Sequence, residues 1–150
     1  MYRGDLSNQV PLRVYVVFEG LLGIIPDAKS RALEKLARKR KKWDQAAGYY
    51  ELNVPTSRGI RDLYRRHNYR VDVITFIDPL FVDAVRSKLD GRNLLFGDVH
   101  YYSMEELLSE LTYDPWIISV LDPDPNHLLT YGSKGRFCPP DQLNLHGLIL

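Results

Sequence analysis

The 150-residue sequence contains a single cysteine, Cys138, so the chain can form no internal disulfide. A reducing compartment is the default for such a protein. No apolar run approaches the roughly 20 residues that a membrane-spanning helix needs. Residues 1–11 are polar and lack the basic-then-apolar layout of a secretory signal. We therefore expect a cytoplasmic protein without a membrane partner.

Several common site signatures are also missing. Gly20 and Gly23 match neither type of glycine-rich phosphate loop. No Gly-x-Ser-x-Gly nucleophile elbow occurs. The four histidines show no metal-ligand spacing, so we interpret them as surface or turn residues, with His100 and His127 nearest to the predicted strand ends. The net charge of +1 provides no global attraction to a polyanion.

What is present is an alternation of buried strands and amphipathic helices. Three apolar runs suit strands buried on both faces of a parallel sheet: Leu12–Phe18, Val71–Ile77 and Trp116–Leu121. Shorter strands are predicted over Tyr49–Val54 and Asn93–Phe96. Helical patterns cover Ser30–Trp43, the segment from Ser57 to His67, the segment from Asp78-Pro79 to Gly91, and the segment that follows a Ser103/Glu106 capping box.

This order predicts one α/β domain over residues 1–150, a three-layer α/β/α Rossmann-like fold with a mainly parallel sheet. Residues 1–11 form an N-terminal extension and residues 137–150 a proline-rich tail. In such sheets ligands bind beyond the carboxyl ends of the strands. The polar residues at those ends are therefore the candidate site residues: Glu19, Thr75, Asp122 and Asp124.

At these strand ends the sequence resembles the haloacid dehalogenase (HAD) superfamily of phosphatases and phosphotransferases. Where that family has Asp-x-Asp-Gly-Thr-Leu, this chain has the run from Val17 to Leu22, VFEGLL. Thr75 matches the family's second strand end, and Leu121-Asp122-Pro123-Asp124 matches the acids that complete its magnesium site. The resemblance covers Leu12 to Arg136 and implies a HAD-like fold. We expect no cofactor; the resemblance leaves magnesium, held by Glu19, Asp122 and Asp124, as the one candidate.

The departures from the family pattern bear on catalysis. Val17 stands at the nucleophile position and has no lone pair with which to attack phosphorus. The family also has a lysine that neutralises the phosphate and lies shortly before the last strand. That lysine is missing here, because no lysine occurs between Lys88 and Lys134. We therefore predict a non-catalytic binding or regulatory protein. The alternative is a magnesium-dependent phosphohydrolase, of phosphatase or nucleotidase type, whose acids activate water. A third interpretation is a phage or mobile-element accessory protein that binds a host protein.

A basic segment is the second candidate site. Lys29–Lys42 holds eight basic residues and one acid, Glu34. Opposite Leu33 and Leu36, four basic residues fall on one line of the predicted helix: Arg31, Lys35, Arg38 and Lys42. Such a line can follow phosphates, with Trp43 nearby for base stacking, or bind an acidic protein. A solvated helix face is the plain alternative.

Overall fold

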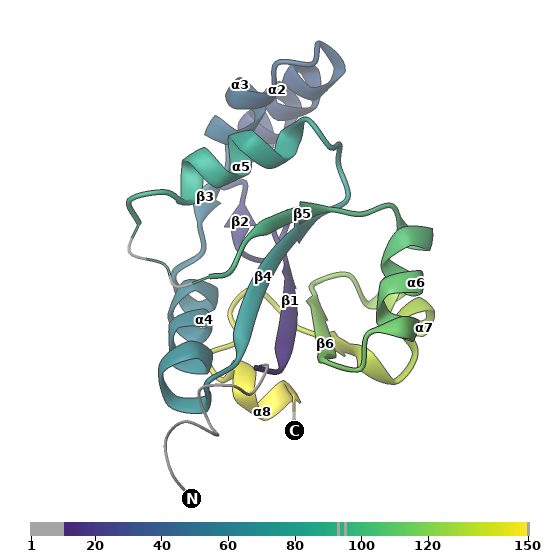
Figure 1. Ribbon diagram of the computed structural model, residues 1–150. Coiled ribbons are helices and arrows are strands. Elements are labelled where there is room, and N and C mark those ends of the chain that lie inside the picture. The colour runs from purple at the N-terminus through teal and green to yellow at the C-terminus, as the bar shows by residue number, and fades with distance from the viewer. Residues whose placement is uncertain (1–10, 93, 95, 150) are drawn as a thin grey trace, which may run out of the picture.

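The computed structural model describes residues 11–92, 94 and 96–149, and at its centre is a five-stranded sheet in which every strand pair is parallel. The strand order is β5-β4-β1-β6-β7 (Figure 1). In chain order the strands are β1 (Arg13–Val17), β4 (Arg70–Thr75), β5 (Val99–Tyr101), β6 (Ile117–Asp122) and β7 (Gly135–Phe137). The predicted fold class, α/β with a mainly parallel sheet, is confirmed.

Strand β1 lies in the middle of the sheet because both of its faces are apolar. Val14 and Val16 belong to one hydrophobic cluster, whereas Tyr15 and Val17 belong to a second cluster on the opposite face. All four side chains are buried. β1 pairs with β4 on one side and β6 on the other, so the three longest predicted strands are direct neighbours.

Helices cover both faces of the sheet and complete three layers (Figure 1). The face of Val14 and Val16 packs against α4 (Val54–His67), α5 (Phe81–Leu89) and α8 (Leu145–Ile149). The face of Tyr15 and Val17 packs against α6 (Met104–Tyr113) and α7 (Leu128–Tyr131). The 3-10 turns η1 (Pro125–His127) and η2 (Gly132–Lys134) flank α7. Among the described residues, no helix is both long and apolar enough to cross a membrane.

An insertion follows β1, and its two helices lie above α5 in Figure 1. Its base is a two-stranded antiparallel sheet of β2 (Gly23–Ile24) and β3 (Glu51–Leu52). Between these strands lie α2 (Ala28–Lys39) and α3 (Trp43–Gly48). The predicted strand over Tyr49–Val54 is therefore only β3, and it lies outside the main sheet.

The single helix predicted over Ser30–Trp43 is wrong, because the chain turns between α2 and α3. Lys41 has a φ of 58°, in the left-handed region that ends helices. Lys42 and Trp43 therefore leave the axis of α2. The helix also begins earlier than predicted, since the Asp27 side chain accepts a hydrogen bond from the Ser30 N–H at 2.7 Å and caps the first turn.

The proline-rich tail packs onto the domain through α8. Leu145 is buried against Gly59 of α4, where a Cβ would overlap its side chain. The strand predicted over 93–96 is not formed at Leu94 or Phe96, while residues 93 and 95 lie outside the described residues. Of the N-terminal extension, residues 1–10 also lie outside them. The predicted Ser103/Glu106 capping box is confirmed, with both of its hydrogen bonds present.

Candidate functional site

The carboxyl ends of β4, β1 and β6 meet at one edge of the sheet, because these strands are parallel neighbours. Thr75 ends β4, Asp122 ends β6, and Glu19 follows β1 by two residues. The turns after β1 and β6 are close together, since a Cβ at Gly20 would lie 3.3 Å from Pro123. Gly20 also has a φ of 89°, which glycine adopts without strain. The topology thus brings together three of the predicted site residues.

The Glu19 carboxylate turns back onto the end of β4. Its Oε2 accepts hydrogen bonds from the Phe76 N–H at 2.9 Å and from the Thr75 hydroxyl at 3.2 Å. Oε1 is buried and has no hydrogen-bond partner among residues 11–92, 94 and 96–149. Burial raises the pKa of the Glu19 carboxyl above its ordinary value, against the opposing effect of the two hydrogen bonds, and the nearby Asp122 charge adds to the rise. Glu19 thus occupies donors that an external anion would otherwise use.

Neither a nucleophile nor a phosphate-binding lysine is supplied to this edge by Val17 or Lys134. Val17 is the last residue of β1 and is buried in the apolar cluster under α6. The Lys134 ammonium donates to the carbonyl oxygens of Leu111 and Asp114, at 2.7 and 3.1 Å. It therefore caps the C-terminus of α6.

Asp122 is almost fully buried, and both of its oxygens accept hydrogen bonds. Oδ1 accepts from the Asp124 N–H at 2.8 Å, and Oδ2 accepts from the Tyr131 hydroxyl at 2.6 Å. The His127 Nδ1 lies 2.9 Å from the same Oδ2. Burial raises the pKa of Tyr131, and its hydrogen bond to Asp122 adds to this rise. Asp122 therefore ties the loop after β6 to α7.

Asp124 belongs to the same loop network. Its Oδ1 caps η1 by accepting from the Asn126 N–H at 2.9 Å, and its Oδ2 lies 3.4 Å from His127 Nε2. In the described part of the chain, no three or more His, Cys, Asp or Glu side chains are grouped to hold a metal ion. Protein donors reach Glu19 Oε2 and both oxygens of Asp122, so of these four oxygens only Glu19 Oε1 has no hydrogen-bond partner among the described residues. One such oxygen is fewer than the several oxygen ligands that magnesium takes. The magnesium assignment stays a prediction.

Two further residues belong to this edge: His127, which the sequence places near a predicted strand end, and Tyr131, which it does not single out. The only signal is spacing, since His127 follows Asp124 by three residues and Tyr131 by seven. This spacing brings both side chains to Asp122 because η1 and α7 fold back onto it. Cys138 is a buried thiol, and burial raises its pKa to about 12.

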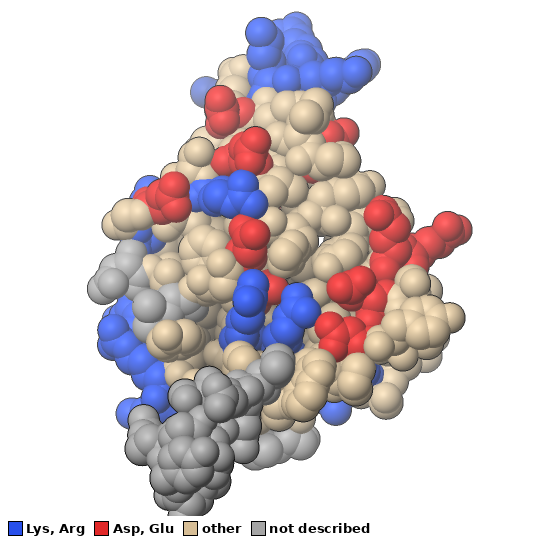
Figure 2. Space-filling model, viewed as in Figure 1, with Lys and Arg blue, Asp and Glu red and all other residues tan. Residues whose placement is uncertain are grey.

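The second candidate site is the basic surface, which we define as the seven exposed cations of α2 and the following turn: Lys29, Arg31, Lys35, Lys39, Arg40, Lys41 and Lys42. Figure 2 shows them at the tip of the insertion. None of the seven makes an ion pair with a described residue. Of the four predicted contact residues, Arg31 and Lys35 lie on this part of α2, whereas Lys42 lies beyond its end.

Arg38, the fourth predicted contact residue, serves the fold. Its Nε lies 2.8 Å from Glu34 Oε2, which also accepts a hydrogen bond from the Tyr50 hydroxyl at 2.7 Å. Glu34 is buried, while Leu33 and Leu36 are 38% and 41% exposed. Leu33 and Leu36, which helical spacing puts on the apolar side of the predicted helix, are therefore not its buried residues. The helix turns Glu34 and Ala37 inward because Tyr50 offers the carboxylate a buried partner.

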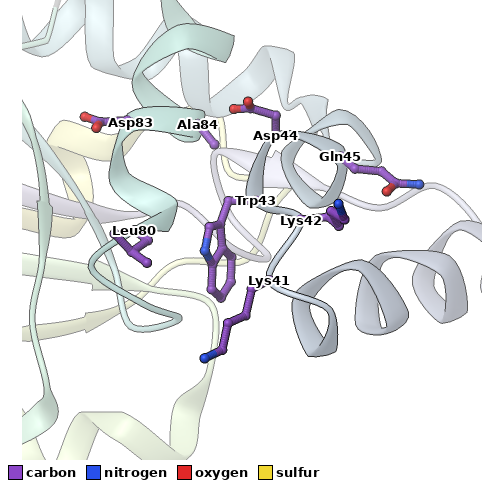
Figure 3. Close-up of a pocket in the computed structure, with 8 residues that line it drawn as sticks. All are labelled: Lys41, Lys42, Trp43, Asp44, Gln45, Leu80, Asp83 and Ala84. Carbon is purple, nitrogen blue, oxygen red and sulfur yellow. The ribbon is translucent and has the colours of Figure 1, made fainter.

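A pocket adjoins the basic surface at the junction of α3 with α5 (Figure 3). Its volume is about 550 Å³. Trp43 forms one wall and packs edge-on against Phe81, with ring centroids 6.2 Å apart. The lining residues are Lys41, Lys42, Trp43, Asp44, Gln45, Leu80, Asp83 and Ala84.

Two solved structures with a similar fold are both the HAD domain of the effector protein Lem4 from Legionella pneumophila. The inactive mutant matches with a TM-score of 0.51 and 14% identity, over 89% of this chain and 88% of that chain. The other structure matches with a TM-score of 0.50 and 13% identity, over 86% and 85%. No protein-family model matches the chain, and no curated protein sequence matches it significantly. At this identity the likeness concerns the fold alone, and it confirms that the chain has the HAD-like α/β fold expected from its strand ends.

Proposed function

We propose that this protein is a non-catalytic HAD-like binding protein that contacts an anionic partner, a protein or a nucleic acid, through the basic surface. The observation that carries the proposal is the position of Glu19. Its carboxylate fills the Thr75 and Phe76 donors at the strand end where a substrate anion would bind. The same edge has Val17 in place of a nucleophile. The donors at this strand end thus bind the protein's own carboxylate and not a substrate.

The basic surface supports the binding half of the proposal. Its seven cations make no ion pair with the described residues, whereas Arg38 of the same segment is paired with Glu34. Unpaired cations crowded on one projecting helix repel one another. An anionic partner would relieve that repulsion and release its own counterions.

The test is a charge reversal that leaves Arg38 in place. We would measure fluorescence anisotropy of labelled oligothymidylate, a DNA duplex and polyglutamate against the wild type and the Arg31→Glu/Lys35→Glu/Lys39→Glu variant. At least one polymer should bind the wild type, and the variant should lose affinity on the order of tenfold or more, less so at high salt.

The matched control reverses three exposed arginines of α4: Arg58, Arg65 and Arg66. Its affinity should stay within about twofold of the wild type, since the same change in net charge then falls outside the basic surface. No binding by the wild type, or an equal loss in both triple variants, would refute the proposal.

The second candidate, a magnesium-dependent phosphohydrolase, is favoured by the HAD-like fold and by the placement of Glu19 and Asp122 at one edge. We would incubate the protein with p-nitrophenyl phosphate and magnesium. If the protein is non-catalytic, as we propose, it should not hydrolyse this substrate. Magnesium-dependent hydrolysis that Glu19→Gln abolishes would establish this candidate instead.

A further inference from the structure

We propose that the partner is a single-stranded nucleic acid, with one base stacked on Trp43 and its phosphates following the basic surface. This inference rests on the proposed function and names its ligand class. It is carried by the pocket between α3 and α5, which shares Lys41 and Lys42 with the basic surface. An aromatic wall therefore lies directly beside cations that make no ion pair with a described residue, and this combination binds single strands irrespective of sequence.

The pocket has the shape and chemistry for one base. In Figure 3 the Trp43 indole projects between the Leu80 side chain and Lys41. Leu80 is 66% exposed and supplies an apolar surface next to the ring. The edge-on contact with Phe81 holds the indole in place. The volume of about 550 Å³ lies within the range of roughly 300–1,000 Å³ typical of small-ligand sites.

Charge orients the strand in the pocket. The Lys41 ammonium lies at one end, whereas the carboxylates of Asp44 and Asp83 lie at the other (Figure 3). Phosphates are attracted to the lysine end, from which α2 continues, and repelled by Asp44, whereas the Asp83 carboxylate is paired with Arg86 at 2.8 Å. The 12 residues of α2 extend about 18 Å, so its cations can follow several successive phosphates of the strand.

The left-handed turn at Lys41 makes this juxtaposition possible. It ends α2 and starts α3 two residues later, so that Trp43 lies next to the last cations of α2 and not one helical turn beyond them. A duplex keeps its bases stacked inside and offers none to the indole. An acidic polypeptide offers carboxylates but no planar ring at each residue. The indole thus favours a single strand over both.

The experiment uses Trp43 as its own reporter in the Trp116→Phe background, which leaves a single indole. We would titrate it with labelled 12-nucleotide oligothymidylate, a labelled 12-base-pair duplex and labelled polyglutamate. Tryptophan fluorescence reports contact with Trp43, and the anisotropy of the labelled polymer reports binding in every variant. Oligothymidylate should quench Trp43 saturably and bind more tightly than the other two. Trp43→Leu should weaken oligothymidylate binding about 5- to 150-fold, the range found when one stacking residue is removed.

Three further variants separate stacking on Trp43 from a change of fold and from charge. Trp43→Phe retains a smaller ring and should show an intermediate loss, provided circular dichroism confirms a native fold. Trp116→Leu removes the other partly exposed indole, at the start of β6, and should leave the affinity within about twofold. Lys41→Gln/Lys42→Gln should reduce the slope of log K against log salt by about 1.4, because two phosphate contacts are lost.

The outcomes separate this inference from the proposed function. If Trp43→Leu binds oligothymidylate as the parent does while the α2 charge reversal weakens it, stacking is refuted and the proposed function stands. Preference for polyglutamate or for the duplex also refutes the single-strand ligand and leaves the proposed function standing. Failure of all three polymers to bind overturns both.

Discussion

Replacement of Glu34 by alanine should release α2 from the remainder of the fold. Glu34 is 1% exposed and lies on an otherwise basic helix. Its Oε2 accepts from the Tyr50 hydroxyl at 2.7 Å and lies 2.8 Å from Arg38 Nε. This carboxylate is therefore the polar anchor between α2 and the segment that precedes β3.

The expected cost follows from what each partner loses. Tyr50 is buried, and a buried hydroxyl without an acceptor costs about 1–3 kcal/mol. The Arg38 side chain is 35% exposed and regains water, so we expect its share to be below about 1 kcal/mol. The free energy of unfolding should fall by about 1–4 kcal/mol, which for a chain of this length lowers Tm by roughly 2–16 °C.

Urea unfolding of Glu34→Ala and the wild type measures this loss, and Glu105→Ala on the exposed first turn of α6 is the control. A double-mutant cycle of Glu34→Gln with Tyr50→Phe should show a coupling energy of about 0.5–3 kcal/mol. Hydrogen exchange should speed up in α2 before it does in β1. A change of Glu34→Ala within about 0.5 kcal/mol of the control would refute the anchor.

Two further predictions concern pH. Burial raises the folded-state pKa of Glu19, so its stabilising effect is present at acid pH and is lost as pH rises through that pKa. In urea unfolding, Glu19→Gln should therefore gain stability relative to the wild type between pH 4 and 8. Stability curves that run parallel over this range would contradict the prediction. Asp72 behaves oppositely: burial alone would raise its pKa, but hydrogen bonds from His100, Arg70 and Arg13 hold it well below the usual range. Asp72→Asn should therefore cost about 3 kcal/mol at neutral pH, and the gap should close as pH falls below about 4; a gap that does not depend on pH would refute the ion-pair account.

Local patterns were enough to predict the central part of the fold. The apolar runs at β1, β4 and β6 are dictated by burial on both faces, and Ser103 with Glu106 specifies the start of α6 through hydrogen bonds only three residues apart. The gathering of Glu19, Thr75 and Asp122 also followed, since parallel neighbours end at one edge. β5, β7 and α8 escaped prediction because they are short and owe their formation to packing.

The direction of each candidate side chain depended on partners far away in the chain. Helical spacing favoured Leu33 and Leu36 as the inner side of α2, yet Glu34 turns inward because Tyr50, 16 residues later, supplies a buried donor. Glu19 reaches Thr75 across 56 residues, and Asp122 engages His127 and Tyr131 only once the loop after β6 folds back. The sequence by itself determined the parallel sheet, the location of its acidic edge and the concentration of charge in α2. Only the tertiary structure decided that the carboxylates of the acidic edge accept hydrogen bonds from their own neighbours and that Trp43 lies beside the basic surface. These contacts join segments whose spacing in sequence carries no periodic signal.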